Sequence, residues 1–209
     1  MTRSPAPLSR PPGDPGGRRI VIYGATGSGK TSLGRRLAET LGLHHIELDA
    51  LYHGPNWTPT PPEEFLAKIQ DAIDARPNGW VADGNYGVAR GLLLPLSDTV
   101  VWLRPPWRVS YLRMLRRTFG RMLRGKELWN GNKETLRGTF LDKKSLLVWG
   151  ILQHKPSQER ITGGLQAIEH RAEVFEVRST KALDALVRRF LDEAKGEVRH
   201  VATDIESRG

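Results

Sequence analysis

Residues 24–31 read G-A-T-G-S-G-K-T, and they directly follow the apolar run I-V-I-Y at 20–23. The spacing is that of a P-loop, in which Gly24, Gly27 and Gly29 allow positive φ and successive N–H groups point inward at phosphate oxygens. Lys30 then reaches the β and γ phosphates, and Thr31 offers its hydroxyl to Mg²⁺. The stretch therefore predicts a phosphate-binding turn between a strand and a helix.

The residues after the loop supply the helix that such a site requires. Leu33, Leu37 and Leu41 recur at helical spacing, and Gly42 follows as a C-terminal stop. The positive end of this helix adds to the same anion site. A glycine-rich turn that merely joined a strand to a helix would explain neither the lysine nor the threonine. We expect ATP and Mg²⁺ to be bound by Gly24, Ala25, Thr26, Gly27, Ser28, Gly29, Lys30, Thr31 and Ser32.

The composition fits a single enzyme domain. The chain has 209 residues, of which 38% are hydrophobic, enough for one buried core. It has no cysteine, which excludes disulfides, thiolate metal sites and thiol catalysis, and a reducing, cytoplasmic setting fits this absence. No apolar stretch approaches the roughly 18 residues that span a bilayer, so we expect a soluble protein without membrane contact.

The two ends differ from the middle of the chain. Residues 1–17 contain five prolines and three glycines, a composition that predicts a disordered N-terminal arm. Residues 196–209 are polar and predict a loose, flexible tail. The folded domain is therefore expected at 18–195.

Within this domain, strand-like and helix-like segments alternate. After the first strand, the pattern predicts strands at 45–48, 80–82, 99–103 and 174–177, and helices from about Pro106 and about Thr180. Thr60, Pro61, Pro62 and Glu63 predict a capping box with proline in the first turn of another helix. Such alternation indicates an α/β fold with a parallel sheet covered by helices on both faces. Ligands of such sheets gather at the carboxyl ends of the strands.

Two carboxylates follow that rule. Asp49 ends the second predicted strand, and Asp83 ends the third. Either could hold Mg²⁺ through water or orient an acceptor hydroxyl for attack on the γ phosphate. A lone Asp at a strand end is ordinarily a turn or N-cap residue, and it is the P-loop that favours the functional interpretation here.

The positive charge is concentrated in one segment. The formal net charge is +9, and residues 104–126 contain eight basic residues and no acid: Arg104, Arg108, Arg113, Arg116, Arg117, Arg121, Arg124 and Lys126. Apolar residues at helical spacing in the same segment predict a helix with one packed face. A solvated basic face is the plainer interpretation. Arginine forks also suit the charge on a transferring phosphoryl group.

Several stretches together resemble the small P-loop kinases related to adenylate kinase. They are the P-loop, L-D-A-L-Y-H at 48–53 with Trp57 after it, V-A-D-G-N-Y at 81–86, V-V-W-L-R-P-P at 100–106 and L-W-N-G-N-K-E at 128–134. Within these kinases the chain is most like the group labelled DNA topology modulation proteins, and the resemblance covers about 19–195. It implies a P-loop NTPase fold with a five-stranded parallel sheet, and a lid-like insertion at about 105–165.

The resemblance also implies roles for single residues. Asp83 resembles the Asp that holds Mg²⁺ through water, and Arg113 and Arg117 resemble the paired arginines that grip the phosphates. Asp49 resembles either the residue that contacts the acceptor in nucleotide kinases or the Asp that binds acceptor hydroxyls in shikimate and gluconate kinases. The expected catalytic residues are therefore Lys30, Asp49, Arg113 and Arg117, and the expected metal site is Thr31 and Asp83.

The chain departs from this pattern at two places. Asn85 and Tyr86 stand where nucleotide kinases have a proline and an arginine, which removes the arginine expected to hold an acceptor monophosphate. Arg104 stands where many relatives carry an acidic residue. These departures argue against adenylate as the acceptor and leave ATP as the donor.

Three functions are compatible with parts of the sequence. The first is a kinase that phosphorylates a small-molecule acceptor of unknown identity. The second is a nucleic-acid-associated ATPase or regulatory protein, in which the basic segment meets phosphate backbone; the segment lacks the exposed aromatics of a stacking platform. The third, a GTPase, lacks an Asn-Lys-x-Asp run, since Asn132 and Lys133 are followed by Glu134 and Thr135. The sequence favours the kinase.

Overall fold

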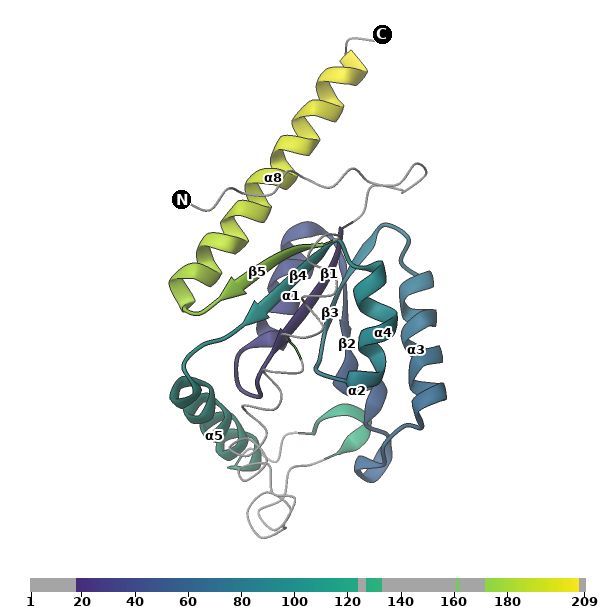
Figure 1. Ribbon diagram of the computed structural model, residues 1–209, viewed down its shortest axis with the longest axis vertical. Helices are drawn as coiled ribbons and strands as arrows, with labels where there is room; N and C mark the ends of the chain where they lie inside the picture. Colours follow the sequence, from purple (N-terminus) through teal and green to yellow (C-terminus); the bar gives the residue numbers. More distant parts are fainter. Residues whose placement is uncertain (1–17, 124–126, 133–160, 162–171, 207–209) are drawn as a thin grey trace.

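The computed structural model describes residues 18–123, 127–132, 161 and 172–206 (Figure 1). Its strands are β1 (Arg18–Gly24), β2 (His44–Glu47), β3 (Gly79–Asp83), β4 (Thr99–Leu103) and β5 (Glu173–Val177). Its helices are α1 (Lys30–Leu41), α2 (Leu48–Tyr52), η1 (Pro55–Trp57), α3 (Pro62–Asp74), α4 (Gly87–Leu96), α5 (Trp107–Leu123), η2 (Trp129–Gly131) and α8 (Thr180–Glu206). The expected arm at 1–17 lies outside the described residues, as do 124–126, 133–160 and 162–165 of the expected lid.

The strands form one parallel sheet with β1 at its centre. The order is β2-β3-β1-β4-β5, and Val21 of β1 pairs with Ala82 of β3 on one side and Val100 of β4 on the other. The middle of β1, residues 20–23, is apolar and buried because helices cover both faces of the sheet. The sheet confirms the predicted α/β P-loop fold with five parallel strands.

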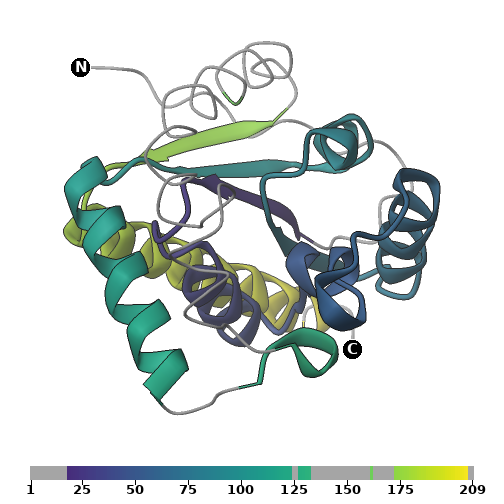
Figure 2. The same ribbon diagram turned by 90° about the horizontal axis from the view of Figure 1, so that it is seen from below.

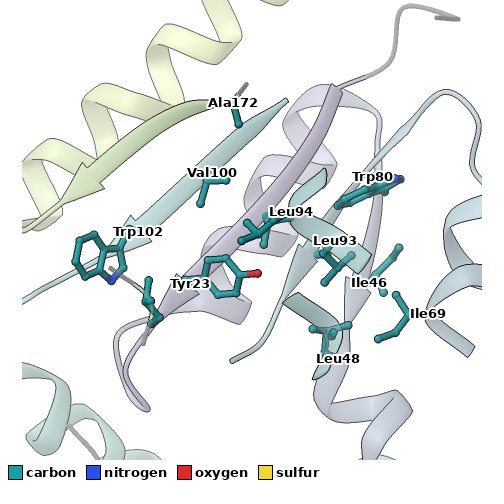
Figure 3. Close-up of a cluster of buried hydrophobic side chains, with 14 of the residues drawn as sticks. Tyr23, Ile46, Leu48, Ile69, Trp80, Leu93, Leu94, Val100, Trp102 and Ala172 are labelled. Carbon is teal, nitrogen blue, oxygen red and sulfur yellow. The ribbon is translucent and has the colours of Figure 1, made fainter. Parts of the chain in front are cut away.

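Side chains alternate between two cores, one on each face of the sheet. Ile20 and Ile22 of β1 pack with residues of α1 and α8. Val21 and Tyr23 point to the opposite face and pack with residues of α3 and α4, as the cluster in Figure 3 shows. The sheet is therefore covered on both faces (Figure 2), and its carboxyl edge is where polar groups can meet a ligand.

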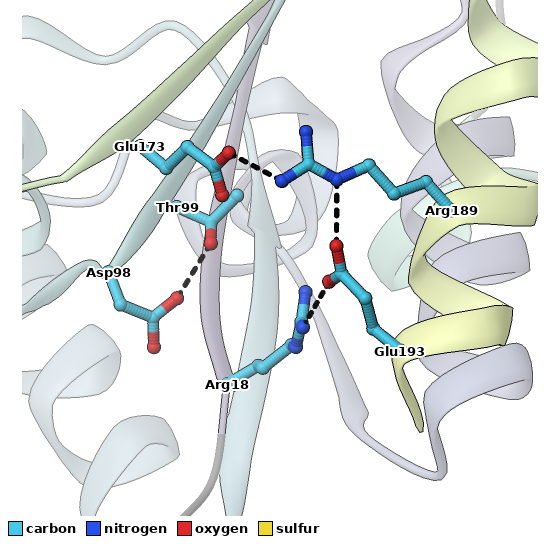
Figure 4. A network of polar contacts seen from close by, with 6 residues as sticks. All are labelled: Arg18, Asp98, Thr99, Glu173, Arg189 and Glu193. Carbon is cyan, nitrogen blue, oxygen red and sulfur yellow. Dashed lines mark hydrogen bonds and ion pairs between the residues drawn. The ribbon is translucent and has the colours of Figure 1, made fainter. Parts of the chain in front are cut away.

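Ion pairs gather at the opposite, amino-terminal edge of the sheet. Arg18 pairs with Glu193 of α8 at 2.5 Å, and Arg189 of the same helix pairs with both Glu193 and Glu173, each at 2.7 Å (Figure 4). Nearby, Asp98 accepts hydrogen bonds from the Thr99 hydroxyl at 2.8 Å and from the backbone N–H of Arg19 at 2.8 Å. This network ties α8 to the starts of β1 and β5, away from the P-loop.

Two expectations about helix ends were wrong. Thr60 does not cap α3; its hydroxyl donates to Leu51 O at 3.0 Å, and the cap position is taken by Pro61 without a side-chain hydrogen bond. The backbone of 196–206 is helical where a loose tail was predicted. Extending an existing helix is cheaper than nucleating one, and no proline interrupts this stretch. Among the described helices, none combines the length and apolarity needed to cross a membrane.

Candidate active site

The P-loop backbone depends on its glycines in two different ways. Gly27 and Gly29 have φ values of 78° and 100°, in the left-handed region that favours glycine. Gly24 is not among the residues with positive φ, so the expectation for this glycine was wrong. A Cβ on Gly24 would lie 2.6 Å from Ser28 Oγ and 2.8 Å from Leu103 O, too close for any side chain. Gly24 is thus required by close packing between the loop and β4.

Lys30 is held inside the loop that it follows. Its Nζ donates to Gly24 O at 2.9 Å and to Ala25 O at 3.3 Å. Burial lowers the pKa of Lys30, while the carboxylates of Asp49 and Asp83 raise it. The ammonium therefore lies close to both carboxylates, in the position from which it can turn to phosphate oxygens.

Thr31 and Asp83 meet directly, although they are far apart in the sequence. Thr31 Oγ1 donates to Asp83 Oδ2 at 2.7 Å, and Asp83 is 3% exposed. On its other oxygen, Asp83 Oδ1 lies 3.1 Å from His45 Nε2. The His45 ring fits because Gly34 of α1 has no side chain, and a Cβ there would lie 2.4 Å from Nε2. Sequence reasoning missed His45, and its place on a strand beside β3 is the signal that could have found it.

The Thr31–Asp83 pair fits a magnesium ion accompanied by phosphate. Within the part of the chain that the structure describes, no three His, Cys, Asp or Glu side chains gather as a metal cage. Mg²⁺ does not require one, since it keeps several waters and is held by one or two protein oxygens plus substrate phosphates. A hydroxyl and a carboxylate beside a P-loop are the donor set for such an ion.

Asn85 fastens the P-loop to the end of β3. Its Oδ1 accepts from Gly24 N at 3.3 Å and its Nδ2 donates to Gly24 O at 2.5 Å, so one amide satisfies both backbone groups. The sequence analysis treated Asn85 only as a departure from nucleotide kinases. Its contact to a loop 61 residues away explains why an amide, with one donor and one acceptor end, stands here.

Asp49 has a hydrogen-bond partner different from those of Asp83. It is in the first turn of α2, because β2 ends at Glu47, earlier than the sequence predicted. Tyr86 Oη donates to Asp49 Oδ1 at 2.6 Å and lies 3.5 Å from His53 Nε2. Burial and the charge of Asp49 raise the pKa of Tyr86, so this phenol stays a donor. Burial also lowers the pKa of His53, which favours the neutral ring, and Asp49 partly opposes this.

The structure separates the two arginines that the sequence placed together. The charge of Arg117 lowers the pKa of Lys30, so this guanidinium acts on the P-loop lysine. Arg113 lies one turn earlier on α5 and reaches Thr180 at the start of α8, where its Nη2 is 3.4 Å from Oγ1. Arg113 thus contacts the start of α8, whereas the charge of Arg117 acts on the P-loop lysine.

A cavity of about 270 Å³ opens beside the P-loop, on the side of Arg113. Its walls come from the P-loop, the start of α5 and the turn between β5 and α8: Ser28, Leu103, Pro105, Pro106, Val109, Arg113, Val177, Arg178, Ser179, Thr180 and Leu183. Apolar walls with a few polar groups suit a flat heterocycle. Because Ser28 belongs to both the cavity and the P-loop, a ligand here can be continuous with bound phosphates.

Two solved structures of kinases align with most of the chain. A gluconokinase from Sinorhizobium meliloti 1021 aligns with a TM-score of 0.52 and 22% sequence identity, over 90% of this chain and 98% of that chain. A shikimate kinase from Acinetobacter baumannii, in complex with shikimate, aligns with a TM-score of 0.41 and 16% identity, over 90% of this chain and 94% of that chain. No family model and no curated protein matches the chain. The likeness to the gluconokinase agrees with the P-loop fold described above.

Proposed function

We propose that this chain is an ATP-dependent kinase that transfers the γ-phosphoryl group of ATP to a hydroxyl group of a small molecule. The proposal is carried by two carboxylates that have different hydrogen-bond partners and whose charges both act on Lys30. Asp83 is bonded to the P-loop threonine, whereas Asp49 is bonded to Tyr86, outside the loop. In this proposal Asp83 helps to bind the magnesium ion on the phosphates, and Asp49 activates the acceptor hydroxyl that attacks the γ phosphate.

The donor nucleotide spans the P-loop and the neighbouring cavity in this proposal. The N–H groups of the loop and Lys30 bind the phosphates, and the base lies between the apolar walls at Val109 and Leu183. Arg113 stands at this cavity and contributes to nucleotide binding. Mg²⁺, held by Thr31 and through water by Asp83, would neutralise charge on the β and γ phosphates.

The acceptor approaches from the side of Asp49. As the acceptor oxygen attacks the γ phosphorus, its proton passes to Asp49, the bond to the bridging β–γ oxygen breaks, and ADP leaves. The Tyr86 hydroxyl holds the carboxylate in place for that proton. Arg117 adds positive charge beside Lys30, where negative charge accumulates during transfer.

A screen for ATP consumption tests the proposal. Purified protein is incubated with Mg²⁺ and ATP alone, or with sugars, sugar acids, nucleosides, nucleotides and hydroxy acids, and ADP is measured. We expect at least one hydroxyl compound to stimulate ADP formation above idle hydrolysis. Lys30→Ala, whose ammonium has no core role, should abolish the stimulation without changing the circular dichroism spectrum. Stimulation by nucleoside monophosphates alone, unaffected by Asp49→Asn, would contradict the hydroxyl-acceptor proposal.

A further inference from the structure

Three aromatic side chains from two segments distant in the sequence meet beside Asp49, and we call His53, Trp57 and Trp129 the aromatic rim. The His53 ring centroid lies 5.3 Å from that of Trp57, edge to face, and 6.0 Å from that of Trp129, with nearly parallel planes. The Trp57 and Trp129 centroids are 6.5 Å apart at 84°. These separations lie within the range of direct ring contacts.

The rim is assembled by asparagines that join η2 to the chain around η1. Asn132, only 4% exposed, accepts from Trp57 N at 2.9 Å and donates to Gly54 O at 2.9 Å. Asn130 donates to His53 O. In Figure 1 the teal-green segment 127–132 lies next to α2, at the same end of the molecule as α5. The contacts thus fix Trp129, distant in sequence, against the loop that follows Asp49.

The rim is contiguous with the proposed acceptor carboxylate. His53 belongs to the rim, and its Nε2 is 3.5 Å from the Tyr86 hydroxyl that donates to Asp49. Trp57 is 36% exposed, while His53 and Trp129 are half-buried. None of the three residues is fully buried, as contact with a molecule whose hydroxyl reaches Asp49 requires.

The charges around the rim favour an uncharged ligand. Burial lowers the pKa of His53, and the smaller effect of the Asp49 charge raises it. The His53 ring therefore stays neutral near pH 7. Tyr86 occupies the place where a phosphate-binding arginine would be expected in a nucleotide kinase. The part of an acceptor that packs on the rim would thus meet a phenol and neutral rings, whereas the Lys30 ammonium lies at the P-loop.

We infer that the acceptor is a neutral alcohol carrying a flat ring, which packs on the aromatic rim while its hydroxyl reaches Asp49. The inference rests on the proposed kinase function and specifies its substrate class. Nucleosides and aromatic alcohols belong to this class, whereas open-chain polyols and sugar acids do not. Base–aromatic stacking tolerates many ring types, so we expect the rim to bind flat rings with little preference for a particular base.

Binding can be measured without turnover by calorimetric titration of the full chain. The donor cavity is first filled with a non-hydrolysable ATP analogue and Mg²⁺, so that a nucleoside cannot bind there. Adenosine, guanosine, cytidine, uridine and benzyl alcohol are then compared with ribose and gluconate. We expect at least one ring compound to bind tenfold or more tightly than ribose. Trp129→Ala and Trp57→Ala should each weaken that binding by roughly 5- to 150-fold.

Two controls separate stacking from damage to the fold. Trp107→Ala removes another exposed tryptophan, which packs on Tyr111 of α5 and not on the rim, and should leave binding unchanged. Trp129→Phe keeps a flat ring and should restore most of the affinity lost in Trp129→Ala. Thermal unfolding of each variant checks that it is folded.

The outcomes for the rim and for the kinase can be told apart. Ring compounds that bind no better than ribose, or that bind rim variants as tightly as the wild type, would overturn the inference. Rim-dependent binding without any phosphoryl transfer from ATP would instead refute the kinase and leave the rim as a binding site. Efficient transfer to ribose or gluconate would keep the kinase and refute the rim's role.

Discussion

Thr31 donates its hydroxyl hydrogen to Asp83 across 2.7 Å, which joins the first turn of α1 to the end of β3. The contact exists because β1 and β3 are neighbours in the sheet, so the residue that follows the P-loop lysine faces the end of the adjacent strand. A hydroxyl and a carboxylate at this distance can hold one magnesium ion through bound water.

Asp83→Asn should raise the Mg²⁺ concentration needed for half-maximal ATP turnover. The amide can still accept from Thr31 but has lost the negative charge that attracts the ion. Mg²⁺ titrations of turnover in both proteins measure the change, and Asp184→Asn, a partly exposed carboxylate paired with Arg36 on the surface, is the matched control. An unchanged Mg²⁺ dependence in Asp83→Asn would mean that Asp83 only fastens the first turn of α1.

Asp49→Asn should depress phosphoryl transfer by about 10²- to 10⁴-fold, because a positioned general base contributes that much to such steps. ATP affinity and Mg²⁺ dependence should stay near those of the wild type, since Asp49 lies on the acceptor side of Lys30. Single-turnover kinetics separate the transfer step from binding. If transfer continues at a near-normal rate, the acceptor supplies its own nucleophilic oxygen and no base operates.

Replacing Arg113 and Arg117 of α5 should give different kinetic defects. Arg117→Ala should lower kcat with little change in the KM for ATP, because its charge acts on Lys30. Arg113→Ala should mainly raise the KM for ATP, because Arg113 lines the cavity beside Thr180. Equal defects in both variants would contradict this division of roles.

The same arginines test the nucleic-acid alternative. If the basic segment bound phosphate backbone, Arg108→Ala would weaken DNA binding about as much as Arg113→Ala or Arg117→Ala, and the affinity would fall steeply with salt. We expect instead that DNA binds weakly at physiological ionic strength. Filter binding of a short duplex over a salt series measures this, and submicromolar, salt-sensitive binding with intact turnover in the Arg113→Ala, Arg117→Ala variant would contradict the kinase role of these residues.

Asn85→Ala should weaken ATP binding without touching any phosphate contact. It removes two hydrogen bonds to Gly24, each worth about 0.5–1.5 kcal/mol, and releases the start of the P-loop. Asn85→Asp, which keeps the acceptor for Gly24 N but loses the donor to Gly24 O, should be intermediate or worse. Equilibrium titration with ATP measures both. Wild-type affinity in Asn85→Ala would show that the glycine turn holds its shape without the amide.

The buried tyrosines predict a loss of stability at high pH. Burial raises the pKa of Tyr23 to about 12, and burial with the Asp49 charge raises that of Tyr86, whereas an unfolded tyrosine titrates near 10. The contribution of these two tyrosines to the free energy of unfolding is complete below about pH 10. It is lost as the pH rises towards their pKa values in the folded protein, because in this range only the unfolded chain releases these protons. At about pH 11, denaturant should produce a jump in tyrosinate absorbance that shrinks in Tyr23→Phe and in Tyr86→Phe. Full ionisation in the native protein would contradict this.

Several parts of the fold were predictable because their signals are local. The P-loop, the helix after it and the strand at 99–103 were placed from glycine spacing and apolar periodicity, and α1 and β4 have the expected positions. Asp83 was predicted at the end of the third strand, and β3 ends at this residue. Boundaries were less accurate: Thr60 was mistaken for a cap, since its hydroxyl bonds a carbonyl outside α3. The helical stretch at 196–206 was missed because helix extension depends on the turns before it.

The sequence by itself determined the glycine-rich loop, the parallel α/β architecture and the carboxylate at the end of β3, because each follows from residues close together in the chain. The tertiary structure alone decided which groups surround them. Asn85 reaches Gly24, His45 reaches Asp83, Tyr86 reaches Asp49 and Asn132 reaches the backbone around Trp57. Each of these contacts spans 37 or more residues of chain. They depend on the order of strands in the sheet and on the path of the chain after α5, which no local pattern encodes.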